Sequence, residues 1–314
     1  MKRVTRGLIL SAAGGAVVYV AFAAFANWQR VREDLALFNW WLFGAALALA
    51  ASNYLVRFVK WHYYLGRLGL AVPRSRSLCI FLSGFTLTVT PGKMGEVIKS
   101  YLLRESDGAP MARTAPVVVA ERLTDLIALI LLAATGALTY EVGWGGIAAG
   151  AALVVGFLAA LSSQRLMHAL LKPLGKKALE LYDSMTILVK PAPLLVATVL
   201  SVVAWACECM AFYLVIRGFP GVRASVGLAT FIYASMTIAG ALSFLPGGLG
   251  VTEVGMTALL AKLAHTDKSV AFAATFVVRL ATLWFGVAVG MVALAIFQRR
   301  HHVAVDLAAE TPPA

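Results

Sequence analysis

Long apolar runs separated by short polar segments dominate this chain of 314 residues. A helix needs about 20 predominantly apolar residues to cross a hydrocarbon layer of about 30 Å. Because several runs reach that length, the pattern predicts an all-α polytopic membrane protein. Six transmembrane spans are predicted, near residues 7–26, 39–57, 115–139, 144–162, 194–216 and 270–297.

The first apolar run follows basic residues, as the apolar region of a signal peptide does. Its length and its lack of a small-residue cleavage site favour a retained helix instead. We therefore expect no removal of this N-terminal segment.

The composition supports the same class of protein. Hydrophobic residues make up 61% of the chain and charged residues 13%, which excludes an ordinary soluble globular protein. The net charge of +12 alone would also fit a nucleic-acid-binding protein, but the cations gather beside the predicted spans. These basic residues are Lys2, Arg3, Arg6, Arg57, Lys60, Arg67, Arg74, Arg76, Arg165, Lys172, Lys176, Lys177, Lys190, Arg299 and Arg300.

The position of these cations predicts the orientation of the chain. Ends of spans that carry excess Lys and Arg face the cytoplasm. Both termini are therefore expected on the cytoplasmic side of a bacterial-type inner membrane, and no nucleic-acid partner is expected.

Two further apolar stretches, 77–104 and 225–263, are interrupted by Pro-Gly sequences. Backbone groups released by such a break must be satisfied by protein or water, so the breaks belong in the bundle interior. Counting spans brings both ends of the first stretch to the cytoplasmic side and both ends of the second to the outer side. The sequence therefore predicts two re-entrant helical hairpins of opposite orientation. The second stretch is also long enough for one arm to span, and this alternative stays open.

The two breaks share a spacing that indicates an internal duplication. The motifs TPGKMGE and LPGGLGVTE end at Glu96 and Glu253, and an arginine follows each glutamate by 26 positions, Arg122 and Arg279. The two copies are offset by 157 residues, half of the chain. With the opposite orientations, this spacing predicts an inverted repeat that has its substrate site between the halves, near the bilayer midplane.

One membrane domain, residues 1–314, is predicted to contain both repeats. The first repeat covers 7–139 and the second covers 144–298, followed by a polar tail at 299–314. A lysine-bearing amphipathic segment at 163–193 is predicted to form a cytoplasmic interfacial helix between the halves.

Each Pro-Gly break is predicted to start a half-helix near the middle of the membrane. Pro91 and Pro246 suit a first helical turn because proline fixes φ and lacks an amide donor. The free amides and the positive end of the helix dipole then favour an anion at the midplane. The alternative interpretation is a pair of ordinary helix kinks. The candidate substrate-binding residues at these tips are Gly92, Lys93, Gly247 and Gly248.

Ionisable side chains inside the apolar segments are a second candidate feature, because each costs about 2.5 to 3.5 kcal/mol at a helix centre. One interpretation pairs each arginine with the glutamate 26 positions before it, as a structural tie between a hairpin and the next helix. The other assigns Arg122 and Arg279 to a substrate phosphate, which a guanidinium binds well. In that interpretation Glu96 and Glu253 serve coupling or orient the arginines.

Three further acids are predicted to support this site. Glu121 and Asp125 share one helix face at i and i+4, and Arg122 is turned about 100° away. Glu208 has no partner visible in the sequence and is expected to face the cavity.

The residue pattern offers no basis for metal, cofactor or enzyme chemistry. Cys79, Cys207 and Cys209 lack zinc-like spacing and are expected to be structural thiols. The histidines lack metal-ligand spacing, and no nucleotide-binding loop or nucleophile motif occurs. We therefore expect no enzyme, no cofactor and no metal.

Taken together, the motifs resemble the flippase-like family of the lysylphosphatidylglycerol synthase transmembrane region. The resemblance is carried by the two Pro-Gly motifs and by ERLTD from Glu121 to Asp125, and it covers about residues 7 to 298. In bifunctional members this region is implicated in moving aminoacylated phosphatidylglycerol, which a separate soluble domain makes; other members are single-domain or fused to glycosyltransferases. Only a short tail follows the last predicted span, so a stand-alone member without synthase activity is expected.

The expected function is a lipid transporter that passes an anionic or zwitterionic headgroup through a polar cavity between the repeats. The alternative is a non-transporting partner of a lipid-modifying enzyme or a glycosyltransferase. Membrane lipids are the expected partners, and such an enzyme or further copies of the chain are additional candidates.

Overall fold

The computed structural model describes residues 28–90, 96–140, 144–162 and 164–301, and these residues form helices without any β-strand. The predicted span at 7–26 and the candidates Gly92 and Lys93 lie outside the described residues. The elements are α2 (Trp28–Leu37), α3 (Trp40–Arg67), α4 (Arg74–Ser83), η1 (Gly84–Leu87), α5 (Ile98–Asp107), α6 (Met111–Tyr140), α7 (Trp144–Ser162), α8 (Gln164–Leu171), η3 (Lys172–Leu174), α9 (Lys176–Leu188), α10 (Pro191–Arg217), α11 (Val226–Leu242), η4 (Pro246–Gly248), α12 (Val251–Leu263), α13 (Lys268–Arg279), η5 (Leu280–Trp284) and α14 (Phe285–His301).

The length and hydropathy of these helices identify an all-α polytopic membrane protein. In the described part of the chain, three helices are long and apolar enough to cross a bilayer: α3, α10 and the continuous helix Lys268–Arg300. The predicted spans at 115–139 and 144–162 fall within α6, of 30 residues, and α7, of 19 residues. That these two helices also cross the membrane stays a prediction.

The helix that contains the second predicted span is longer than that span. α3 continues past residue 57 to Arg67, and Arg57 and Lys60, expected at the cytoplasmic membrane surface, are buried within it. The physical reason is that both cations find a carboxylate partner, Asp125, on another helix. An average over hydropathy cannot anticipate such a partner.

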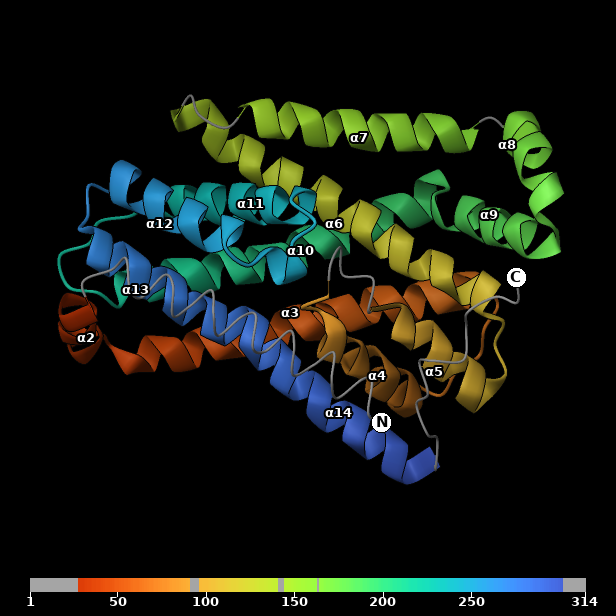
Figure 1. The fold of residues 1–314 in the computed structure, drawn as a ribbon, viewed down its shortest axis with the longest axis horizontal. Coiled ribbons are helices and arrows are strands. Elements are labelled where there is room, and N and C mark those ends of the chain that lie inside the picture. Colours follow the sequence, from red (N-terminus) through yellow and green to blue (C-terminus); the bar gives the residue numbers. More distant parts are fainter. Residues whose placement is uncertain (1–27, 91–95, 141–143, 163, 302–314) are drawn as a thin grey trace.

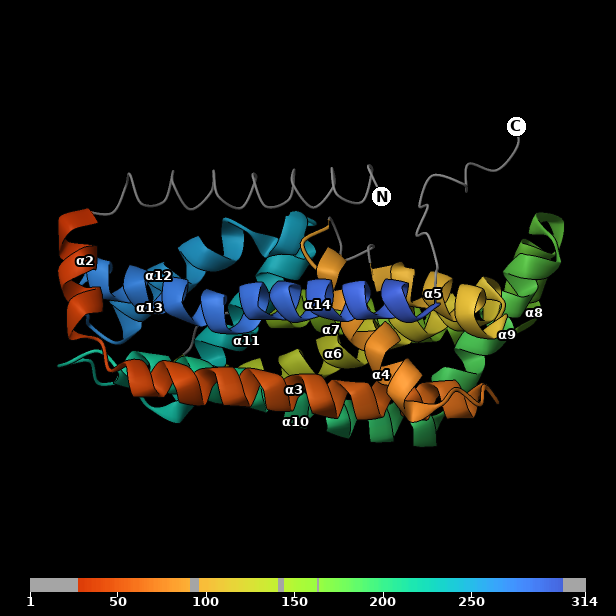
Figure 2. The ribbon, with the colours of Figure 1, turned by 90° about the horizontal axis from the view of Figure 1, so that it is seen from below.

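The helices α3 and α10 lie side by side and run in opposite directions along one face of the molecule (Figure 2). At one end of the pair, the amide of Asn39 donates to the carbonyl of Gly218 at 3.0 Å. Further along, the side-chain amide of Asn53 donates to the carbonyl of Ala204 at 2.7 Å. Residue numbers thus rise along α3 as they fall along α10, which is the relation that an inverted repeat requires of equivalent helices.

Each Pro-Gly region separates two helices that fold back on one another. α4 packs against α5, and α11 packs against α12. The two pairs lie toward opposite ends of the long axis (Figure 1). In the second break, Gly247 and Gly248 have φ of 62° and 67°, a left-handed conformation that glycine adopts without steric cost.

A residue just before the first break packs against the second break. Val89, which directly precedes the first break, forms a small apolar cluster with Leu249 of the second break and with Leu283. Figure 1 shows α4 with α5 and α11 with α12 approaching this region from the two ends. Their re-entry from opposite membrane leaflets stays a prediction.

The segment 163–193 departs from its prediction as one interfacial helix. It contains two helices, α8 and α9, joined by η3 and by Gly175, which has φ of 92°. Pro173 and Gly175 account for the interruption, because neither favours a helix interior. α9 packs against α6, and Lys172, Lys176 and Lys177 are exposed.

Candidate functional site

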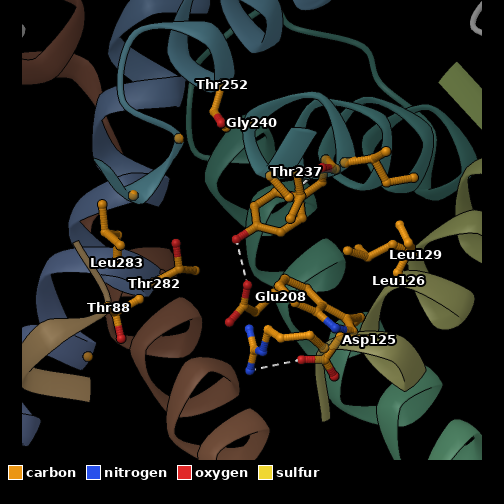
Figure 3. A pocket seen from close by; sticks show the side chains of 18 of the residues that line it. Thr88, Asp125, Leu126, Leu129, Glu208, Thr237, Gly240, Thr252, Thr282 and Leu283 are labelled. Atoms are coloured by element: carbon orange, nitrogen blue, oxygen red, sulfur yellow. Dashed lines mark hydrogen bonds and ion pairs between the residues drawn. The ribbon is translucent and has the colours of Figure 1, made fainter. Parts of the chain in front are cut away.

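A cavity of about 280 Å³ lies beside the second break and is also lined by Phe85 and Thr88 (Figure 3). Its wall includes residues of η1, of the break between α11 and α12, and of helices α3, α6, α10 and α13. Apolar and hydroxyl side chains make up most of the lining. The charged residues that line it are Arg57, Arg122, Asp125, Glu208 and Arg279.

The first ion pair expected from the spacing of 26 residues is present. Arg122 Nη2 lies 3.2 Å from Glu96 Oε2, so the residue that follows the first break is bound to α6. Glu96 is buried, whereas the Arg122 side chain keeps 26% of its surface exposed. This arginine is therefore both a structural tie and a group open to the cavity.

Lys99, which the sequence motifs did not single out, extends this contact. Its ammonium lies 2.5 Å from Glu121 Oε2 and 3.5 Å from Glu96 Oε2, and it is 2% exposed. A signal was available, because Lys99 is a cation in an apolar segment one helical turn after Glu96. Glu121 therefore pairs with Lys99 of α5, and it does not line the cavity.

The second expected pair is also present, but its arrangement differs. Arg279 Nε donates to Glu253 Oε1 at 2.6 Å, and Arg279 Nη2 donates to the carbonyl of Gly247 at 2.8 Å. The other oxygen of Glu253 accepts the amide of Gly250 at 2.7 Å. Arg279 and Glu253 therefore hold the second break in shape, and the Arg279 side chain is only 9% exposed.

The amides at the second break are largely used within the break itself. The amide of Gly248 donates to Leu245, the amide of Leu249 donates to Pro246, and that of Gly250 donates to Glu253. Gly247 and Gly248 line the cavity as predicted candidates, yet these three donors are not free for an anion. The prediction of free amides at this helix start is wrong for these positions, because the turn consumes them.

Asp125 is the centre of a buried network and not a peripheral support. Its Oδ1 accepts from Lys60 Nζ at 2.6 Å and from Ser201 Oγ at 3.0 Å. Its Oδ2 lies 3.4 Å from Arg57 Nη2 and 3.2 Å from Arg122 Nη2. Although Arg122 starts from a helix face about 100° from that of Glu121, its long side chain reaches Asp125, about one turn along the same helix.

Glu208, which had no partner visible in the sequence, accepts a hydrogen bond from the hydroxyl of Tyr233 at 2.7 Å. Figure 3 shows Glu208 on the cavity wall, near Asp125. Tyr233 belongs to α11 and Glu208 to α10, so only the packing of these helices brings them together. No periodic pattern along the chain indicates this contact.

Cys79, Cys207 and Cys209 are free thiols, and Cys79 donates to the carbonyl of Ala293 at 3.3 Å. Within the residues that the structure describes, no group of three or more His, Cys, Asp or Glu is placed to hold a metal ion.

Comparisons with known proteins agree on the membrane character of the chain. The family model described as "Lysylphosphatidylglycerol synthase TM region" matches residues 7–290. The chain is 26% identical to the UPF0104 membrane protein MJ1078 of Methanocaldococcus jannaschii, across 68% of this chain and 95% of that protein. It is 25% identical to a UPF0104 membrane protein of Methanothermobacter thermautotrophicus, across 76% of this chain and 80% of that protein.

Proposed function

Because the chain belongs to the family of the lysylphosphatidylglycerol synthase TM region, we propose that it transports a membrane lipid. The observation that carries the proposal is the cavity of about 280 Å³ beside the second break, which is lined by charged side chains from both halves of the chain. A lipid headgroup would occupy this cavity during transfer, while its hydrocarbon tail stays in the bilayer. No chemical conversion of the lipid is proposed.

The arrangement of helices supports an inverted repeat, which allows access to alternate between the two sides of the membrane. Met111 begins α6, and Lys268, 157 positions later, begins α13. The antiparallel packing of α3 and α10 agrees with the same offset. Rocking of one half against the other would open the cavity to each leaflet in turn.

The charged groups of the cavity suit an anionic or zwitterionic headgroup. Arg57 and Arg122 present guanidinium groups, which bind phosphate through paired hydrogen bonds. The carboxylate of Glu208 on the same wall suits a cationic part of the headgroup. Glu96 and Glu253 lie behind the cavity-lining arginines and would orient them or couple transport to an ion.

Apolar side chains at the second break would accommodate the beginning of a lipid tail. Leu242, Phe244 and Leu245 line the cavity, and Phe244 is also 72% exposed at the surface of the molecule. An exposed large apolar side chain beside a polar cavity is unfavourable in water and favourable in lipid.

We propose that the protein resides in the inner membrane with both termini in the cytoplasm.

The proposal is tested by measuring the movement of fluorescent phospholipids in vesicles that contain the purified protein. Arg122→Ala should reduce the rate about tenfold or more, because one charge-assisted contact to the headgroup is lost. Arg76→Ala is the matched control, since Arg76 pairs with Asp107 away from the cavity and should leave the rate unchanged. Normal transport by the Arg122 variant would refute the assignment of this cavity.

A wild-type protein that moves no lipid, and that instead purifies with a lipid-modifying enzyme or a glycosyltransferase, would favour the non-transporting role. Thermal stability of each variant is measured alongside, so that loss of transport is separated from loss of fold.

A further inference from the structure

The two arginines at equivalent positions of the proposed repeats are held very differently. Arg279 is committed through short bonds of 2.6 Å and 2.8 Å to Glu253 and to the backbone of the second break. Within the described residues, the ionic contacts of Arg122 are longer, both 3.2 Å, to Glu96 and Asp125. Charge-assisted N–H···O bonds are normally about 2.7 to 2.9 Å, so Arg122 is paired loosely.

Arg57 joins Arg122 on the same carboxylate oxygen. Its Nη2 lies 3.4 Å from Asp125 Oδ2, also longer than a strong ionic hydrogen bond. Among the described residues, the Nε atoms of Arg57 and Arg122 are buried and make no hydrogen bond. Arg57 itself is 6% exposed and lines the cavity. Two guanidinium groups thus share one oxygen and keep further donors unused.

The other oxygen of Asp125 is held firmly from the opposite side. Lys60 and Ser201 bind Oδ1 at 2.6 Å and 3.0 Å, and neither residue lines the cavity. The carboxylate would therefore remain paired with Lys60 if both arginines turned toward another anion. Breaking the contacts to Oδ2 would leave no buried charge without a partner, which is the usual large cost of such a step.

We propose that the Asp125 carboxylate occupies a phosphate-binding site formed by Arg57 and Arg122. A phosphate group that enters this site takes the place of Asp125 Oδ2 at the two arginines. Incoming phosphate oxygens take the guanidinium donors, Nε included, while Lys60 and Ser201 retain Oδ1. On release of the phosphate, the arginines return to Asp125, so the empty site keeps its charges paired. Arg279 maintains the second break and takes no part in this exchange.

The proposal rests on the proposed function only for the source of the phosphate, which is a lipid headgroup in that case and a free phosphate ion otherwise. Competition by Asp125 weakens phosphate binding, and this makes the exchange directly measurable. Asp125→Asn keeps an oxygen for Lys60 but removes the competing charge. Asp125→Glu keeps the charge and extends the carboxylate toward the arginines.

The test measures the affinity of the purified, detergent-solubilised protein for inorganic phosphate and, in a separate arm, for a short-chain phosphatidic acid. Asp125→Asn should tighten binding about tenfold, the value of one competing ionic hydrogen bond of about 1.4 kcal/mol. Asp125→Glu should weaken binding by a similar factor, and Arg57→Gln should weaken it further. Asp107→Asn breaks an exposed Arg–Asp pair and should change neither affinity.

Unchanged or weaker phosphate binding by folded Asp125→Asn would overturn the proposal. If that variant does not fold, Asp125→Glu decides, and an affinity equal to that of the wild type refutes the exchange. Tight binding of phosphatidic acid but not of inorganic phosphate identifies a lipid as the source, and the reverse result identifies a free anion. Lipid transport is measured separately in vesicles. If transport is absent while these affinities shift as expected, the proposed function is refuted and the exchange of Asp125 for phosphate is supported.

Discussion

Lys99 provides the sharpest test of how charges are accommodated inside this bundle. Its ammonium is buried between Glu121 and Glu96, and it lies 4.7 Å from the centre of the Trp61 ring and 5.3 Å from that of Phe81. A Cβ on Gly84 would come within 2.7 Å of the Lys99 Cγ atom, so the aliphatic part of this side chain packs closely against η1. The pair with Glu121 joins the first hairpin to α6.

The second half of the chain has apolar residues at the equivalent positions, and both belong to one hydrophobic cluster. Met256 and Val278 stand 157 positions after Lys99 and Glu121, and both are fully buried. The fold thus offers its own apolar replacement for the ionic pair. The relevant comparison is between Lys99→Met alone and Lys99→Met combined with Glu121→Val.

The two variants should differ strongly in stability. Removing one partner of a buried ion pair costs about 3 to 5 kcal/mol, because the remaining charge is left uncompensated. Lys99→Met should therefore lower the free energy of unfolding by about that amount. Replacing both partners with apolar groups is often neutral, so the double variant should recover most of the loss. Glu96 keeps its contact with Arg122 in both variants.

Thermal denaturation in detergent, followed by the loss of monodisperse protein, measures this difference. At roughly 2 to 4 °C per kcal/mol, Lys99→Met should lower the midpoint by roughly 6 to 20 °C. Arg76→Met, which removes an exposed pair with Asp107, should lower it by far less. If the double variant is no more stable than Lys99→Met alone, the apolar pair does not replace the ion pair, and the reasoning is refuted.

Three further predictions concern the second half of the chain. A Cβ at Gly240 would collide with Thr252, so Gly240→Ala should separate α11 from α12 and lower the melting midpoint; an unchanged midpoint would contradict the close packing. Tyr233→Phe removes the hydrogen bond to Glu208, and it should slow lipid transport about fivefold with a stability loss of about 1 kcal/mol, as measured in vesicles and by thermal melting. Arg279→Lys cannot make both bonds of the arginine fork, so transport should fall while phosphate affinity stays within about twofold; a large loss of affinity would place Arg279 in the phosphate site.

The sequence by itself determined the helical membrane class and the two contacts that follow a fixed spacing. Apolar runs long enough to cross a bilayer are expected to be helical, because a helix satisfies all backbone hydrogen bonds within the segment. The pairs of Glu96 with Arg122 and of Glu253 with Arg279 repeat at one spacing, and both are present in the structure. A duplicated spacing is visible in a sequence because it needs no knowledge of which helices are neighbours.

Only the tertiary structure decided which charges share a site. The sequence predicts Arg57 and Lys60 as surface cations near the end of a span. In the structure both contact Asp125, more than 60 positions away in the chain. The hydropathy of α3 is the same whether that partner exists or not. Burial of a charge is tolerable only next to a counter-charge, and the counter-charge belongs to another helix.

The difference between Arg122 and Arg279 also arises from packing. Both follow a glutamate at the same spacing, but the second break turns its Gly247 carbonyl toward Arg279, while Arg122 faces Asp125 and the cavity. Position 125 has its counterpart in Thr282, which donates to its own helix backbone at Val278. Equivalent positions along two copies therefore acquire different roles, because side-chain partners depend on how helices pack and not on their order in the chain.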